Sequence, residues 1–351
     1  MSVTKVSSAM QDLTDDYAFS GTVSGAGAPS HRNDIINGGL VVNQENQTAP
    51  ADDAYTIGDL FLHVGEGTPV MSLETDGPQG VRPWQKMVLD VNAQGGLVYF
   101  MSNADCQDYI ANGKLSFGIQ LKTTAATIAN ARIGILKWTG TADAVTSDVV
   151  GTWASDGTNP TLATSWSYEN TPANIGLTTS FARHTVEDVT VDSDTKNIAI
   201  FIWTDDGTIT ASDVIGFSEW QCNPGSTVNA FSSPNISVTR DNVRYFLEIL
   251  GDDIANQSVC QGSAISTTIA DCIWVYTVKK RIIPTTTLEG TITDWGCNNN
   301  GSHPASGVSY QNKSQSSCMF RVTVSVNFVA GDSCSLTSAQ LTAFAKIDAR
   351  F

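Results

Sequence analysis

Four carboxylates near the middle of the sequence are the residues that could most directly do chemistry: Glu187, Asp188, Asp205 and Asp206. Two acidic groups held about 5–9.5 Å apart can cleave a glycosidic bond, one as the acid and the other as base or nucleophile. Asp206 is followed by Gly207, and Asp-Gly is a common sequence for a tight hairpin turn, which explains the second pair without catalysis. We therefore expect no catalytic residue and no enzymatic activity, with polysaccharide hydrolysis as an alternative.

Other reactive motifs are missing from the sequence. It has no GxSxG, GxxxxGK[ST], GxGxxG or HExxH pattern. The segment 192–197 has alternating oxygen ligands, but Lys196 stands where a calcium loop needs a further ligand. No CxxC pair occurs among the seven cysteines, so buried thiols are expected, with a late disulfide as the alternative. The four histidines are scattered over different segments: His31, His63, His184 and His303. We expect no bound metal and no cofactor.

Aromatic side chains are the remaining candidates for binding. Sugar rings stack their C–H faces on aromatic rings, and such contacts tolerate a shallow, wet site. Trp138 and Trp203 end apolar segments, so we expect them in the core. Aromatic residues in polar connections are better candidates because binding residues concentrate on loops. On this basis the predicted ligand-binding residues are Trp153, Trp166, Trp295, His303 and Tyr310.

The composition restricts the partners. The chain has 35 acidic and 19 basic residues, a net charge of -16, which repels phosphate backbones and anionic lipids. No apolar stretch approaches the roughly 18 residues of a membrane span, and the first residues lack the apolar core of a secretory signal. We expect no nucleic acid partner, no membrane insertion and synthesis in a cytoplasm without a signal peptide.

Alternating apolar residues predict an all-β fold. Leu115, Phe117, Ile119 and Leu121 share one face of a strand because successive side chains point to opposite faces. Similar segments cover residues 97–101, 132–138, 185–191, 197–203 and 214–220. Turn formers separate them, and no sustained helical period is present. The pattern predicts an antiparallel jelly-roll sandwich.

A second β segment follows, at 244–351. Alternation restarts at Tyr245, Leu247 and Ile249 and is clearest in the run 320–328. Between 291 and 317 the sequence is rich in polar and turn residues, which predicts a long loop. At 351 residues the chain is long enough for about two domains. We expect an N-terminal docking tether at 1–32, the sandwich at 33–243 and a smaller C-terminal β domain at 244–351.

Several stretches resemble bacteriophage tail-fibre proteins whose body is a jelly roll like a carbohydrate-binding module. The opening NDIINGG is followed by GKLSFGIQLKTTA, ARIGILKWTGTADAVTSDVV, DGTNPTLATSWSYENTPANIGLTTSF and NIAIFIWTDDGTITASDVIGFSEWQCNPGSTVNAF. Glu219, Gly225, Ser226, Thr227 and Phe231 match the ending of that pattern. The next segment, RDNVRYFLEIL, departs from it because it lacks the usual Cys and Gln. The likeness covers roughly residues 33–351.

The resemblance implies a virion structural protein of the tail-fibre type that binds a host-surface glycan and is located in the virion. It also implies a homotrimer and contacts between the N-terminus and other virion proteins. No functional residue of the family carries over to a numbered position. Two alternatives are a virion protein without a ligand, such as a head fibre, capsid decoration or tail adaptor, and a polysaccharide depolymerase tailspike.

Overall fold

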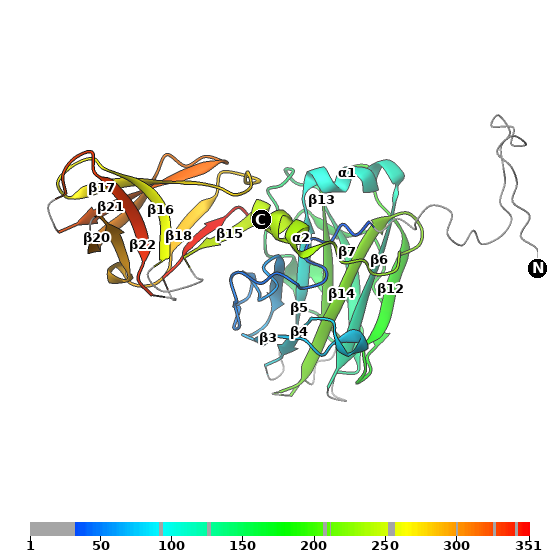
Figure 1. Ribbon diagram of the computed structural model, residues 1–351. Helices are drawn as coiled ribbons and strands as arrows, with labels where there is room; N and C mark the ends of the chain where they lie inside the picture. Colours follow the sequence, from blue (N-terminus) through cyan, green and yellow to red (C-terminus); the bar gives the residue numbers. More distant parts are fainter. Residues whose placement is uncertain are drawn as a thin grey trace, which may run out of the picture.

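The computed structural model describes residues 32–90, 94–124, 128–205, 209–210, 212–251, 257–299, 301–325, 328–340 and 343–351. The predicted tether lies outside these residues except for Arg32. The all-β class is confirmed, with 45% strand and 9% helix. Figure 1 shows two β bodies, a sandwich in blue to green and a smaller unit in yellow to red, with a short helix between them.

Two antiparallel sheets form the sandwich. In the first sheet, the strands run in the order β1 (Ala54–Tyr55), β2 (Phe61–Gly65), β5 (Gly95–Met101), β13 (Asn197–Thr204), β7 (Asn130–Trp138) and β10 (Trp166–Tyr168), and β11 (Ile175–Gly176) also pairs with β7. In the second sheet, the order is β12 (Ala182–Thr190), β6 (Lys114–Thr123), β14 (Val214–Pro224), β4 (Trp84–Val88) and β3 (Val70–Glu74). The short strands β8 (Val150–Thr152) and β9 (Thr161–Leu162) pair with each other.

The sandwich core lies between the sheets. All four apolar residues of the predicted β6 face are buried, and Phe117 lies 5.8 Å from the Trp220 ring of β14. The first sheet is buried on its outer face as well, where Trp138, Trp166 and Phe201 belong to a second apolar cluster. This double burial explains why every residue of β13 is buried.

Two α-helices in the described residues were not predicted. α1 (Asn103–Asn112) is capped by the Ser102 side chain, and α2 (Ile236–Phe246) is capped by Asn235. Thr239, Val243 and Phe246 are the buried side of α2, at helical spacing. The prediction that the second β segment includes Tyr245 is therefore wrong. Tyr245 lies in the helix, and the strand begins at Leu247.

The second body combines a small sheet with a closed barrel. The sheet is β15 (Leu247–Leu250), β23 (Ala345–Asp348) and β18 (Thr285–Leu288). The barrel runs in the order β16 (Gln257–Ala264), β17 (Ile269–Val275), β21 (Ser317–Val324), β20 (Ser302–Gln311), β19 (Trp295–Asn298) and β22 (Ser333–Ser338). All seven cysteines of the chain are buried free thiols, as expected.

The predicted long loop at 291–317 is wrong. It contains the 3-10 turn η3 (Ile292–Asp294), β19 and β20. A narrow barrel needs apolar side chains only on its inner side, and Trp295 and Cys297 supply them in β19. The outward positions are small and polar, which makes this strand pair look like a loop in the sequence.

Candidate functional site

The outer face of the second sheet carries polar side chains from an otherwise apolar strand. In β6, Gln120 and Lys122 alternate with the buried Ile119 and Leu121, so they point away from the core. Lys122 is paired in register with Gly216 of β14. This face is where the sandwich can present side chains to a ligand, because its first sheet is covered on both sides.

Two aromatic rings support Lys122. The Lys122 Nζ lies 3.7 Å from the Trp84 ring centroid and 4.7 Å from that of Phe181. The two rings meet edge to face at 5.6 Å. A Cβ atom at Gly216 would lie 2.8 Å from Cε3 of Trp84, so the glycine makes room for the indole. Cation–π contacts with these two rings thus position the Lys122 ammonium group.

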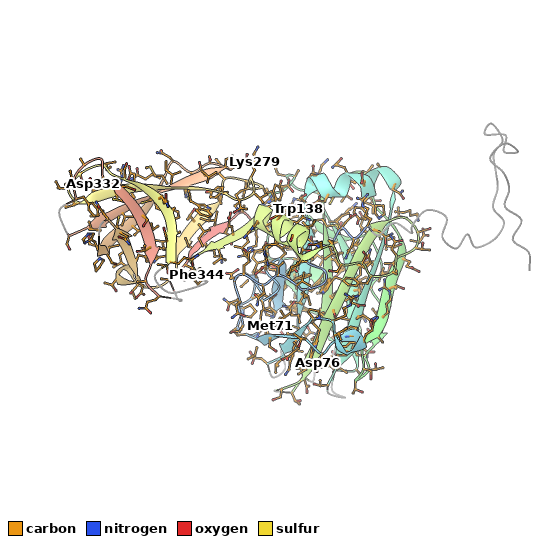
Figure 2. All side chains as sticks on the ribbon, viewed as in Figure 1. Met71, Asp76, Trp138, Lys279, Asp332 and Phe344 are labelled. Carbon is orange, nitrogen blue, oxygen red and sulfur yellow. The ribbon has the colours of Figure 1, made fainter. Side chains whose placement is uncertain are left out.

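The loop at residues 76–79 lies beside these two rings. The Trp84 Nε1–H donates to Asp76 Oδ1 at 2.8 Å, and this hydrogen bond lowers the pKa of the Asp76 carboxyl below its usual value. Figure 2 shows Asp76 at the end of the sandwich away from α1. Gln79 follows in the left-handed conformation, with φ 61°, which is uncommon for a residue with a side chain. The segment from Asp76 to Gln79 is therefore held beside the polar face of β6 by the Asp76–Trp84 hydrogen bond.

A groove of about 460 Å³ lies at this place, and we call it the sheet-face groove. The polar and aromatic side chains that line it are Gln79, Gln120, Lys122, Thr179, Ser180 and Phe181. Burial lowers the pKa of Lys122 despite its attraction to Asp76 and Glu74. The groove thus combines one aromatic ring, two amides, two hydroxyls and an ammonium group. These groups can stack on a ring and exchange hydrogen bonds with hydroxyls.

A second cavity of about 630 Å³ lies between β12 and residues 168–175. Glu187 and Asp188, two of the carboxylates singled out in the sequence, line it. Glu187 Oε1 accepts the Val228 N–H at 2.7 Å, and Asp188 pairs with Lys114 at 3.1 Å. The carboxylates here are thus engaged in contacts within the fold.

The amide of Asn170, which also lines this cavity, bonds the backbone of β7. Its Oδ1 accepts from the Ile135 N–H and its Nδ2 donates to the Ile133 carbonyl. Asp205, from the other carboxylate pair, is buried and ion-paired with Arg132 at 3.1 Å. Asp206 lies outside the described residues. Because so many polar groups of the cavity serve the fold, the sheet-face groove is the better candidate site.

Two of the five predicted ligand-binding residues lie in the interior. Trp166 is 6% exposed, with its ring 5.1 Å from that of Trp138, and it begins β10 rather than lying in a loop. Trp295 is 1% exposed, and its Nε1–H donates to the Glu289 carbonyl at 3.1 Å. Neither ring has a free face for a sugar, because each packs in a core that the local sequence does not reveal.

The other three predicted residues are half-buried and do not form one site. Trp153 packs against Phe201 of the sandwich at 6.0 Å. His303 and Tyr310 lie on β20 of the barrel, where their rings contact Phe328 and Phe320. The residues of the sheet-face groove were missed. The sequence signal that could have indicated the groove is the pair of long polar side chains, Gln120 and Lys122, at alternate positions of an apolar strand.

No group of three or more potential metal-ligating side chains occurs in the described part of the chain. No helix among these residues is long and apolar enough to cross a membrane.

No family model and no curated protein matches the sequence. Among solved structures, the chain is similar to TmCBM61 in complex with beta-1,4-galactotriose, at 12% identity and a TM-score of 0.32, covering 55% of this chain and 99% of that one. It is also similar to a family 11 carbohydrate-binding module from Clostridium thermocellum, at 10% identity and a TM-score of 0.28, covering 52% and 97%. A tandem CBM22 structure from Paenibacillus barcinonensis Xyn10C matches at 10% identity and a TM-score of 0.32, covering 82% and 91%. These likenesses are too distant to assign a ligand.

Proposed function

We propose that this protein is a non-catalytic glycan-binding protein and that the sheet-face groove holds the glycan. The observation that carries the proposal is the position of Phe181 and Lys122 beside Gln120 on the polar face of β6. A sugar ring can stack on Phe181 while the amide and ammonium groups bond its hydroxyls. A shallow groove of this kind gives a weak site, which suits a protein that binds in several copies.

We further propose that the chain is a tail-fibre-type virion protein that attaches to a host-surface glycan. This part rests on the sequence resemblance, which also supports a homotrimer, N-terminal contacts with other virion proteins and location in the virion. Joining several weak sites can raise avidity by about 10²–10⁴ without new contacts. A trimer with one groove per chain would gain from this effect.

The experiment is a screen of the full chain against an array of bacterial surface glycans, followed by calorimetry with each glycan that binds. Phe181→Leu removes the aromatic face, and we expect about tenfold weaker binding, equivalent to about 1.4 kcal/mol. Lys122→Met should also weaken binding. Lys279→Met, an exposed lysine of the C-terminal body that lies outside the groove lining, is the matched control and should bind as the wild type does. Unchanged affinity in Phe181→Leu would exclude the groove as the site.

A depolymerase is the second candidate because Glu187 and Asp188 line the larger cavity. A reducing-end assay with purified host polysaccharide tests it. Release of reducing ends by the wild type, and its loss in Glu187→Gln, would replace the non-catalytic proposal.

A further inference from the structure

A third cavity lies where the helix between the two bodies passes into the C-terminal unit. It has a volume of about 180 Å³ and is bordered by the end of α2, by β15 and by the adjoining parts of β16 and β17. We call it the junction cavity. The side chains with polar groups in its lining are Arg244, Glu248, Gln257, Ser258, Trp274 and Thr277.

Three residues of this cavity carry a buried polar atom without a hydrogen-bond partner among the described residues. These atoms are Arg244 Nε, Gln257 Oε1 and Trp274 Nε1. Buried polar groups in folded proteins are nearly always hydrogen-bonded, so an exception calls for an explanation. Three exceptions around one cavity indicate that a molecule outside the chain provides the missing partners.

The neighbouring charged groups are already satisfied. The buried Lys280 Nζ lies 2.6 Å from Glu248 Oε2 and also donates to the Arg244 carbonyl. The Thr277 hydroxyl donates to Glu248 Oε1 at 2.8 Å. Glu248 is therefore neutralised and hydrogen-bonded, and the Arg244 guanidinium lies 3.6 Å from Asp241. No net charge is left that would require a charged ligand.

The three unpartnered atoms define the chemistry of the ligand. Arg244 Nε and Trp274 Nε1 are donors, whereas Gln257 Oε1 is an acceptor. A carboxylate only accepts and would leave Gln257 unsatisfied, and the net charge of -16 disfavours any anion, phosphate included. An ammonium group only donates and would leave both N–H groups unsatisfied. A hydroxyl group accepts and donates at once, so neighbouring hydroxyls satisfy all three atoms.

The size of the cavity restricts the ligand further. Pockets for drug-sized molecules have volumes of about 300–1,000 Å³. A cavity of about 180 Å³ suits one small ring and not an oligomer.

We propose that the junction cavity binds one neutral, hydroxylated sugar residue. Its hydroxyl oxygens accept from Trp274 Nε1 and Arg244 Nε, and one of its hydroxyls donates to Gln257 Oε1. This site is separate from the sheet-face groove and does not depend on it. The chain would then hold two saccharide sites, one on each β body.

Ordered water is the competing occupant, since a volume of about 180 Å³ would hold about six waters at about 30 Å³ each. The test is therefore a titration that reports on the Trp274 N–H itself. The full chain, labelled with ¹⁵N, gives indole N–H signals in a two-dimensional NMR spectrum, and Trp274→Phe assigns the signal of Trp274. The probes are the methyl glycosides of glucose, galactose, mannose and N-acetylglucosamine, with sodium acetate as the control.

We expect a saturable shift of the Trp274 indole signal with at least one glycoside and none with acetate. Gln257→Leu should weaken this binding by at least tenfold, and Arg244→Met provides a second, independent variant if Gln257→Leu does not fold. Lys122→Met, which alters only the sheet-face groove, should leave the shift unchanged. This last variant separates failure of the groove from failure of the junction cavity.

Three results would overturn the proposal. A Trp274 signal that does not move up to the solubility limit of the sugars means that water alone fills the cavity. A shift with acetate but not with sugars means that the site takes anions. A sugar shift that survives Gln257→Leu and Arg244→Met at full affinity means that the sugar binds elsewhere.

Discussion

Arg350 Nη2 lies 2.6 Å from Glu45 Oε2, which anchors the end of the chain on the sandwich. The guanidinium also donates to the Asp59 carbonyl at 2.7 Å and lies 3.9 Å from the Tyr55 ring centroid. Lys346 bonds the other oxygen of Glu45. The sandwich and the C-terminal unit are therefore joined by buried, directional contacts rather than by α2 alone.

Replacing Arg350 by Met should lower the free energy of unfolding by about 3–5 kcal/mol. The reason is that removing one partner of a buried ion pair leaves the other charges uncompensated, here Glu45 and Asp348. Urea denaturation followed by tryptophan fluorescence measures the change. A loss as small as that of an exposed pair would contradict the anchoring role.

The matched control is Arg321→Met, which breaks the Arg321–Asp271 pair at 2.8 Å on the barrel surface. Both side chains keep some contact with water, at 33% and 16% exposed, so the charge left behind is partly solvated and this variant should lose clearly less stability than Arg350→Met.

Acidification should destabilise the fold through His63. The residue is 1% exposed, with Nδ1 at 3.2 Å from the Ala51 carbonyl, and burial lowers the pKa of His63 below the usual 6.5. The unfolded chain therefore binds a proton more readily than the folded chain does. The contribution of His63 to stability is complete above about pH 6.5 and is lost as the pH falls from there toward the folded-state pKa.

The pH effect is measured by urea denaturation at about pH 7.5 and about pH 5.5, on either side of the usual histidine pKa of about 6.5. His63→Gln should show a smaller loss of stability between these values than the wild type. Burial raises the pKa of Asp59 to about 6, which acts in the opposite direction, but this contribution is common to the wild type and the variant. Equal losses in His63→Gln and the wild type would exclude His63 as the cause.

The sequence predicted the strands of the sandwich well, but the residues that it singled out for binding are not those of the sheet-face groove. Period-two alternation identifies β6 because one of its faces is buried against the opposite sheet. Closure of the barrel depends on pairing between β16 and β22, which are far apart in the chain, and no local pattern encodes it. Trp166 lies among polar neighbours in sequence, yet its neighbours in space are Trp138 and Phe100. Polar neighbours in the sequence therefore do not indicate that an aromatic ring is exposed.

Gly216→Ala should destabilise the protein by about 1–3 kcal/mol and weaken glycan binding at the groove. The new Cβ would lie 2.8 Å from Cε3 of Trp84, and overpacking a filled site forces side chains out of position. Displacement of Trp84 also disturbs the cation–π contact that positions Lys122. Gly176→Ala is the control, because an added Cβ there would have no other heavy atom within 4 Å. This variant should change neither stability nor binding appreciably.

The seven cysteines should be unreactive in the folded protein and fully available after unfolding. All are buried, and burial raises the pKa of Cys318 and of Cys334 to about 11, so little thiolate forms at neutral pH. Ellman's reagent should release almost no thionitrobenzoate from the native protein and seven equivalents in urea without a reductant. Fewer than seven equivalents in urea would mean that a disulfide forms in the purified protein. Rapid reaction before unfolding would instead mean that the barrel interior is open to solvent, contrary to the burial of Cys297 and its neighbours.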